Sequence, residues 1–242
     1  MAKIEKLGAK KTEKLGAKKG EKVEKKKNAF SRFIDFYNNN QKILSIILIV
    51  ILVAIGAIIA FKKFYLEPQN KKAAALMVEP IKLFVQGDSV SIRLALEGDD
   101  DVDGFETIAS DFTLTKAGNS ANYYTGLCYL KLGEKEDALE YLLKFKRKED
   151  VLWYHVQGII GDLYDEMDDE TNALKYYKRA CESENAFYAP IDMFKLAQFY
   201  ESQEEWEEAY NLYQQIENKF YSQFQNMNVD KYMERARINA EK

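Results

Sequence analysis

Residues 120–145 read SANYYTGLCYLKLGEKEDALEYLLKF, and a related pattern returns twice further along the chain. The second copy is YHVQGIIGDLYDEMDDETNALKYYKRA at residues 154–180, and the third is PIDMFKLAQFYESQEEWEEAYNLYQQI at residues 190–216. Equivalent alanines at Ala138, Ala173 and Ala209 are spaced by 35 and then 36 residues. A repeat of this period predicts a stack of similar helical units rather than one globular core.

Three classes of residue recur at fixed places in each copy. They are a small residue (Gly126, Gly161, Ala197), an aromatic three residues later (Tyr129, Tyr164, Tyr200) and a large side chain sixteen residues after the small one (Leu142, Tyr177, Tyr213). We expect two antiparallel helices per unit, with the small residue allowing close approach and the large one filling the groove. Gly133 suits the turn of the first unit, where the later units have Asp168 and Glu204. One unit cannot bury its apolar face alone, so the units should stack.

This pattern resembles the tetratricopeptide repeat (TPR) family over about residues 119–222. The chain departs from the family at the tryptophan near the start of each unit, replaced by Asn122, Gln157 and Met193. It also departs at the proline that ends each unit, replaced by Asp150, Asn185 and Tyr221. The resemblance implies an all-α, TPR-type solenoid of helical hairpins that binds other proteins.

An uninterrupted apolar segment precedes the repeats. Residues 43–61, ILSIILIVILVAIGAIIAF, carry no charge, and a helix of this length spans about 28 Å. Lys62 and Lys63 follow directly and suit the membrane interface. We therefore predict a transmembrane anchor over residues 43–63. A cleaved signal peptide is the alternative, since Ala54-Ile-Gly56 offers a small-x-small site, but the apolar run continues past it.

Charge is distributed unevenly on the two sides of this segment. Residues 1–42 hold thirteen Lys/Arg against five acids, a balance of +8, whereas residues 71–242 hold twenty against thirty-three, a balance of −13. The positive-inside rule then predicts a single-pass protein with a cytoplasmic N-terminus and an extracytoplasmic body, which is periplasmic if the membrane is a bacterial inner (cytoplasmic) membrane. The Lys-rich tail is expected to be disordered or weakly helical and to contact anionic lipid, and nucleic acid is not an expected partner.

The predicted organisation has five parts. These are a basic cytoplasmic tail (1–42), the anchor (43–63), a linker with a degenerate helical pair (64–118), three TPR units (119–222) and a C-terminal capping helix (223–242). Within the pair, Asp103 and Glu106 have the spacing of a capping box. The run DDDVDG at residues 99–104 matches half of an EF-hand loop, but Ser110 stands where the bidentate glutamate is needed, so an acidic capping loop is preferred.

The sequence lacks signatures of catalysis. It has one histidine, His155, and two cysteines, Cys128 and Cys181, which we interpret as buried apolar residues rather than a disulfide. No phosphate-binding loop, dinucleotide fingerprint, G-x-S-x-G or HExxH occurs. We expect no enzyme activity, no cofactor and no metal.

The family resemblance instead implies a partner-binding groove lined by the first helix of each unit. Carried over position by position, the groove residues are Tyr123, Leu127, Lys131, His155, Asp162, Glu166, Phe194, Gln198 and Glu201. Aromatic ends and an acidic middle suit an extended or helical segment with apolar anchors and some positive charge. Exposed aromatic residues leave a homo-oligomer open as well.

The layout of tail, anchor and repeats resembles the YfgM-like ancillary subunits of the bacterial Sec translocon, most of all over TKAGNSANYYTGLCYLKLGEKEDALEYLLKFKRKED at residues 115–150. That resemblance implies a scaffold assisting protein translocation or chaperone networks. Its partners would be a translocon subunit, a periplasmic chaperone or a nascent chain. The alternative is a scaffold of another envelope machine, for cytochrome maturation, outer-membrane protein assembly or peptidoglycan synthesis.

Overall fold

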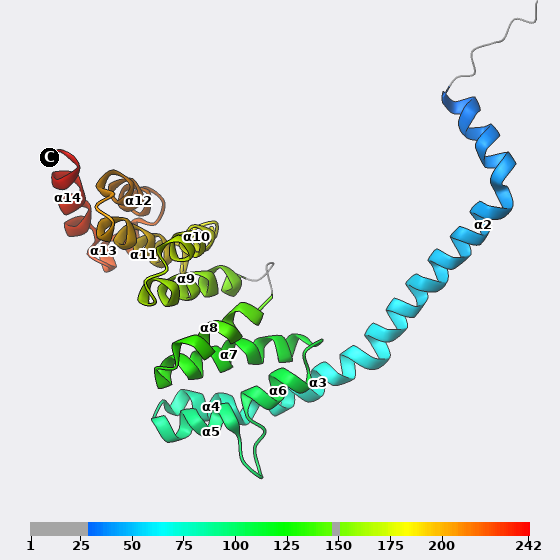
Figure 1. The fold of residues 1–242 in the computed structure, drawn as a ribbon, viewed down its shortest axis with the longest axis horizontal. Helices are drawn as coiled ribbons and strands as arrows, with labels where there is room; N and C mark the ends of the chain where they lie inside the picture. Colours follow the sequence, from blue (N-terminus) through cyan, green and yellow to red (C-terminus); the bar gives the residue numbers. More distant parts are fainter. Residues whose placement is uncertain (1–28, 147–150) are drawn as a thin grey trace, which may run out of the picture. The chain divides into compact units, whose positions relative to one another are not determined.

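The computed structural model describes residues 29–146 and 151–242, with side chains from Phe36 onward. Over these residues the regular elements are helices (Figure 1), and the one β contact is an isolated bridge between Gly98 and Asp103. The predicted all-α class is confirmed. The chain divides into two compact units, residues 1–59 and 60–242, which are described separately.

Helix α2 (Ala29–Phe61) makes up the described part of the first unit and runs on into the second. It belongs to the one helical stretch in the described residues that is long and apolar enough to cross a membrane, and the apolar window of that stretch is not buried by other parts of the protein. The helix begins earlier than the predicted anchor, because it already includes residues 29–42. They contain no glycine or proline to stop it. The remaining tail, residues 1–28, lies outside the described residues.

The region before the repeats is more helical than predicted. It contains a short π-helix, η1 (Lys62–Leu66), and the α-helices α3 (Glu67–Leu76), α4 (Val78–Gln86), α5 (Ser89–Glu97) and α6 (Phe105–Asp111). The expected charged linker at Glu67 is instead the first turn of α3. Pro68 lies at the start of α3, directly after the π-helical residues of η1.

The capping box expected at Asp103 and Glu106 is not formed. Gly104 is the N-cap of α6 and makes no side-chain cap. The Glu106 carboxylate accepts hydrogen bonds from the hydroxyls of Tyr129 (2.6 Å) and Tyr141 (3.0 Å), which turns it away from the helix start. In the acidic loop, Asp99 accepts from the backbone N–H groups of Asp101 and Val102, as a turn-forming aspartate does.

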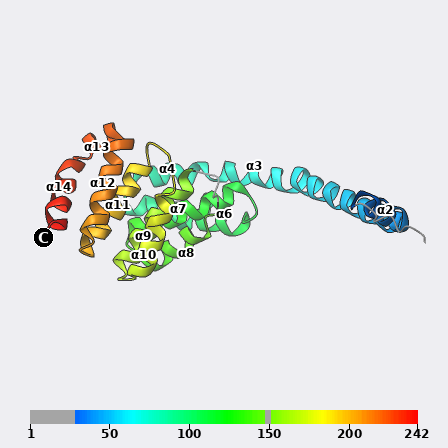
Figure 2. The ribbon, with the colours of Figure 1, turned by 90° about the horizontal axis from the view of Figure 1, so that it is seen from above.

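Three helical hairpins follow, and Figures 1 and 2 show them in chain order. They pair α7 (Lys116–Leu132) with α8 (Lys135–Lys144), α9 (Val151–Glu166) with α10 (Glu170–Ala180), and α11 (Ala189–Ser202) with α12 (Trp206–Lys219). A Cβ on Gly126 would lie 2.6 Å from Leu142, and one on Gly161 would lie 2.6 Å from the Tyr177 ring. In the first two hairpins the small residue is therefore what lets the two helices pack closely.

The turns inside the hairpins share one backbone geometry. Gly133 has φ 82°, and Asp168 and Glu204 adopt φ 59° and 60° at the equivalent positions. In each turn the N–H of the following residue donates to the carbonyl of the recurring tyrosine of that unit, Tyr129, Tyr164 or Tyr200. This is the Schellman type of helix ending, made twice without glycine.

The C-terminal end is closed by α13 (Tyr221–Asn226) and α14 (Val229–Ala240). Val229 and Ala236 are fully buried there, while most of the remaining α14 side chains are exposed. The buried residues of the second unit form three successive hydrophobic clusters rather than one. This is the core arrangement of a solenoid, in which neighbours bury one another.

Candidate partner-binding groove

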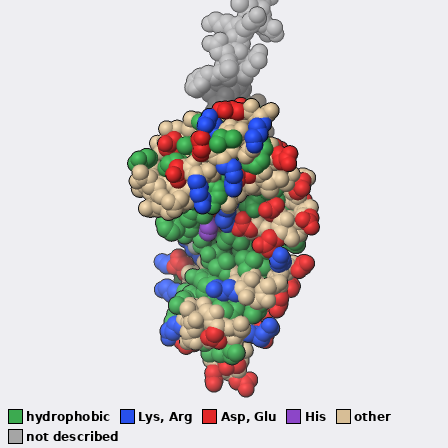
Figure 3. All heavy atoms as spheres, turned by 90° about the vertical axis from the view of Figure 1, so that its left-hand side faces the viewer, with side chains coloured by type: hydrophobic (Ala, Val, Ile, Leu, Met, Phe, Trp, Pro, Cys, Tyr) green, Lys and Arg blue, Asp and Glu red, His purple; other side chains and the backbone are tan. Residues whose placement is uncertain are grey.

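The predicted groove residues come from α7, α9 and α11, the first helices of the three hairpins. Of these nine, Lys131, Glu166 and Gln198 are exposed, and Tyr123, Leu127, His155, Asp162 and Phe194 are half-buried. Glu201 is buried. Figure 3 shows hydrophobic side chains crossing a hollow in the face that it views, with acidic side chains gathered along one edge.

Tyr123 and His155 each pack against another aromatic side chain. The Tyr123 ring lies 5.8 Å from the Phe145 ring, and His155 stacks on Tyr188 with ring centroids 4.5 Å apart. Burial, together with the neighbouring Tyr124 and Tyr188, raises the pKa of Tyr123 to about 12. The phenol therefore stays neutral and can act as a hydrogen-bond donor near the His155–Tyr188 stack.

His155 has a carboxylate partner that sequence reasoning missed. Its Nδ1 lies 3.1 Å from Oδ1 of Asp192, which is fully buried in α11. Gly158 makes room for this contact, since a Cβ there would lie 2.6 Å from the same oxygen. Burial raises the pKa of Asp192, and His155 opposes the rise. The one sequence signal for this pair is an aspartate at a core position of a helix, and it lies thirty-seven residues from His155.

Asp162 is held from two neighbouring helices. It accepts a hydrogen bond from the Tyr177 hydroxyl at 3.0 Å and pairs with the ammonium of Lys195. Burial and the nearby acidic groups raise the pKa of Tyr177, so its hydroxyl remains a donor. This groove position thus ties α9 to α10 and α11.

The other two groove carboxylates also have partners inside the chain. Glu166 Oε2 lies 2.8 Å from the Lys135 ammonium in the preceding unit. Glu201 receives two guanidinium hydrogen bonds from Arg235 of α14. The predicted acidic middle of the groove therefore links successive helices, and its charge is largely neutralised by the chain itself.

Some of the remaining groove residues contact other side chains of the protein, and others are exposed. Phe194 packs edge-on against Tyr232 of α14 at 4.9 Å, and the Lys131 ammonium lies 5.4 Å from the centre of the Phe84 ring. Gln198 is exposed on α11, and Leu127 is half-buried on α7. Lys131, Glu166 and Gln198 are consequently the most exposed of the groove positions.

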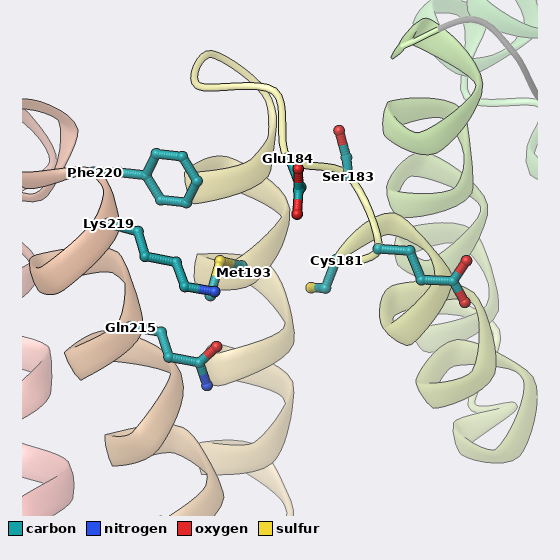
Figure 4. A pocket seen from close by; sticks show the side chains of 8 residues that line it. Cys181, Ser183, Glu184, Met193, Gln215, Lys219 and Phe220 are labelled. Atoms are coloured by element: carbon teal, nitrogen blue, oxygen red, sulfur yellow. The ribbon is translucent and has the colours of Figure 1, made fainter.

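A separate pocket of about 380 Å³ lies between the end of α10, α11 and the end of α12. Its lining residues are Cys181, Glu182, Ser183, Glu184, Met193, Gln215, Lys219 and Phe220 (Figure 4). Burial and the charge of Asp192 raise the pKa of Cys181 to about 12, so the thiol is protonated at neutral pH. It is a poor nucleophile in that state. Both cysteines are free, with Cys128 buried and Cys181 half-buried.

Comparisons with known proteins identify two of the hairpins. Tetratricopeptide repeat models match residues 120–149 and 193–217. Among solved structures, two of MamA are similar, with 17% and 18% identity, TM-scores of 0.47 and 0.46, coverage of 70% and 67% of this chain, and coverage of 88% and 94% of theirs. A Podosopora anserina protein described as a kinesin light chain with nearly identical TPR-like repeats covers 72% of this chain and 93% of its own, at 13% identity and a TM-score of 0.44. No curated protein sequence matches the chain.

Proposed function

We propose that this tetratricopeptide repeat protein is a membrane-anchored scaffold whose array binds a protein partner on the periplasmic side of the inner membrane. The observation that carries the proposal is the union in one chain of a membrane-length apolar helix with a repeat array. The repeats support protein–protein interaction in general. The +8 balance before the apolar segment supports a cytoplasmic N-terminus.

The proposed partner is a component of protein translocation, such as a translocon subunit, a periplasmic chaperone or a nascent chain. The support is the likeness of the layout to the YfgM-like ancillary subunits. A scaffold for cytochrome maturation, outer-membrane protein assembly or peptidoglycan synthesis is the second candidate, because other anchored repeat proteins share this layout.

We also propose that the array binds without catalysing a reaction. Across residues 29–146 and 151–242, no three His, Cys, Asp or Glu side chains gather where they could hold a metal ion. The raised pKa of both cysteines further supports a binding role, since neither thiol is activated. Calcium titration calorimetry tests the half EF-hand, and a heat of binding would contradict the expectation that the protein binds no metal.

Site-specific photocrosslinking in native membranes tests the groove. A photoreactive residue replaces Lys131 or Gln198 on the first helices, and Gln214, exposed on α12, serves as the matched control. We expect both groove positions, and not the control, to crosslink one partner, which mass spectrometry identifies. Recovery of another envelope machine would favour the second candidate. Equal labelling at all three positions would contradict groove binding.

A further inference from the structure

A pocket of about 430 Å³ lies where the repeat body begins. One wall is the η1–α3 segment, which follows the apolar run directly in sequence, and the other is the α6–α7 loop. The lining residues are Lys62, Leu66, Glu67, Asn70, Lys71, Leu114, Thr115 and Lys116. The walls are joined by a 3.0 Å hydrogen bond from the backbone N–H of Ala117 to Oδ1 of Asn70. The pocket is therefore built from two segments that are far apart in the sequence.

Three lysines surround this pocket without carboxylate partners. Lys62, Lys71 and Lys116 are all exposed, and none of them makes an ion pair within the described part of the chain. Glu67 is the one acidic residue in the lining, so the pocket is positive on a body whose balance is −13. This local reversal of charge favours an anionic ligand.

Apolar side chains are exposed beside the lysines. Leu114, at the tip of the α6–α7 loop, is 69% exposed, and Phe64 is 78% exposed. Tyr65 is also exposed and lines a second, smaller pocket against the same loop. A cationic rim with projecting leucine and aromatic side chains matches the boundary between headgroups and acyl chains.

We propose that this pocket binds the headgroup of an anionic phospholipid, in the leaflet that the chain meets as it leaves the membrane. The phosphate would lie among Lys62, Lys71 and Lys116, and Leu114 would enter the acyl region. The inference rests on the proposed anchor, because only a membrane-inserted chain brings Lys62 to the interface. It adds a contact from the α6–α7 loop, which lies well beyond the anchor in the sequence.

The test uses the full chain in lipid nanodiscs with Leu114→Trp as a reporter. We expect brominated phosphatidylglycerol to quench the added fluorescence more strongly than brominated phosphatidylcholine. The matched control is Val85→Trp. Val85 is similarly exposed, at 76%, but it lies about 30 Å along the helical segment from Leu66 of the pocket. Quenching of Val85→Trp equal to that of Leu114→Trp would overturn the proposal.

The lysines are tested in the same reporter background. Replacing Lys62, Lys71 and Lys116 together by glutamine should abolish the preference for phosphatidylglycerol. Replacing the paired Lys82, Lys135 and Lys144 removes the same charge and should leave the preference intact. Equal loss in both triple variants would reduce the effect to net charge and overturn the site.

Two further measurements isolate the anchor and the binding of a soluble anion. Co-elution of the protein with nanodiscs reports the anchor alone, so a failed anchor is distinguished from a failed pocket. Inorganic phosphate is titrated into the detergent-solubilised reporter. A response to phosphate without quenching in nanodiscs would assign the pocket to a soluble anion and overturn the lipid proposal.

Discussion

At the scale of single residues, Gly161 sets the distance between α9 and α10. A Cβ at this position would lie 2.6 Å from the Tyr177 ring, which is itself buried. Gly161→Ala should therefore destabilise the protein by about 1–3 kcal/mol, the usual cost of overpacking. Thermal unfolding followed by circular dichroism measures the loss.

The control for Gly161 is a double-mutant cycle. In a Tyr177→Ala background the ring is gone, and alanine is the better helix former, so Gly161→Ala should become neutral or stabilising. An unchanged penalty in that background would show that the ring contact is not the cause.

Asp192 makes stability depend on pH. Burial raises its pKa above the ordinary value of 3.8, so the folded protein holds this proton more tightly than the unfolded chain does. The resulting stabilisation is fully present below 3.8 and is lost as pH rises through the raised pKa. Asp192→Asn cannot ionise, so its melting temperature should gain on the parent's as pH rises through this window.

Asp88 supplies a control of opposite sign. Hydrogen bonds from Ser91 lower its pKa, so its stabilisation is present above 3.8 and is lost as pH falls through the lowered value. The parent should gain on Asp88→Asn as pH rises. If both variants shifted in the same direction, the roles assigned to the two carboxylates would be wrong.

At the scale of helices, an ion pair between Arg235 and Glu201 joins α14 to α11, beside the apolar contacts of Val229 and Ala236. Glu201 on α11 is buried, and Arg235 on α14 is half-exposed. Arg235→Ala would leave a buried carboxylate without its partner, at about 1–2 kcal/mol once the solvent exposure of the arginine is allowed for. Hydrogen exchange should show faster opening of α14.

Arg237 is the matched control on the same helix. Its two carboxylate partners, Glu234 and Glu241, are exposed and lie beside it in sequence, at the C-terminal end of the chain. Arg237→Ala should change stability much less and leave exchange at the α11–α14 contact unaltered. Comparable effects of the two substitutions would contradict the fastening role of Arg235.

The helical hairpins were predictable from sequence because their determinants are local and repeated. The period of 35 to 36 residues located Gly126, Gly161 and the buried tyrosines, and the structure places them in the hairpin contacts. The capping box failed because Glu106 has stronger partners in Tyr129 and Tyr141, which a short spacing rule ignores. The pairs His155–Asp192 and Glu201–Arg235 depend on how units stack, and periodicity alone does not fix that register.

At the scale of the whole molecule, the charge division governs orientation in the proposed function. The lysines between Lys3 and Lys27 lie outside the described residues, but their charge alone is expected to retain the N-terminus in the cytoplasm. Deleting residues 3–27 should produce chains of mixed orientation, scored by protease accessibility of the repeat body. A control that keeps the length and replaces the lysines by glutamine should behave like the deletion.

The hairpin turns bear on how such an array can change in length. Gly133, Asp168 and Glu204 form the same left-handed turn with matching hydrogen bonds, so the joint does not depend on one side chain. A hairpin can therefore be regarded as an exchangeable module. Duplicating the middle one would insert an extra step between intact ends and move the C-terminal helices further from the first hairpin. The length of the array is thus a quantity that can be set by gene duplication alone, without inventing a new joint.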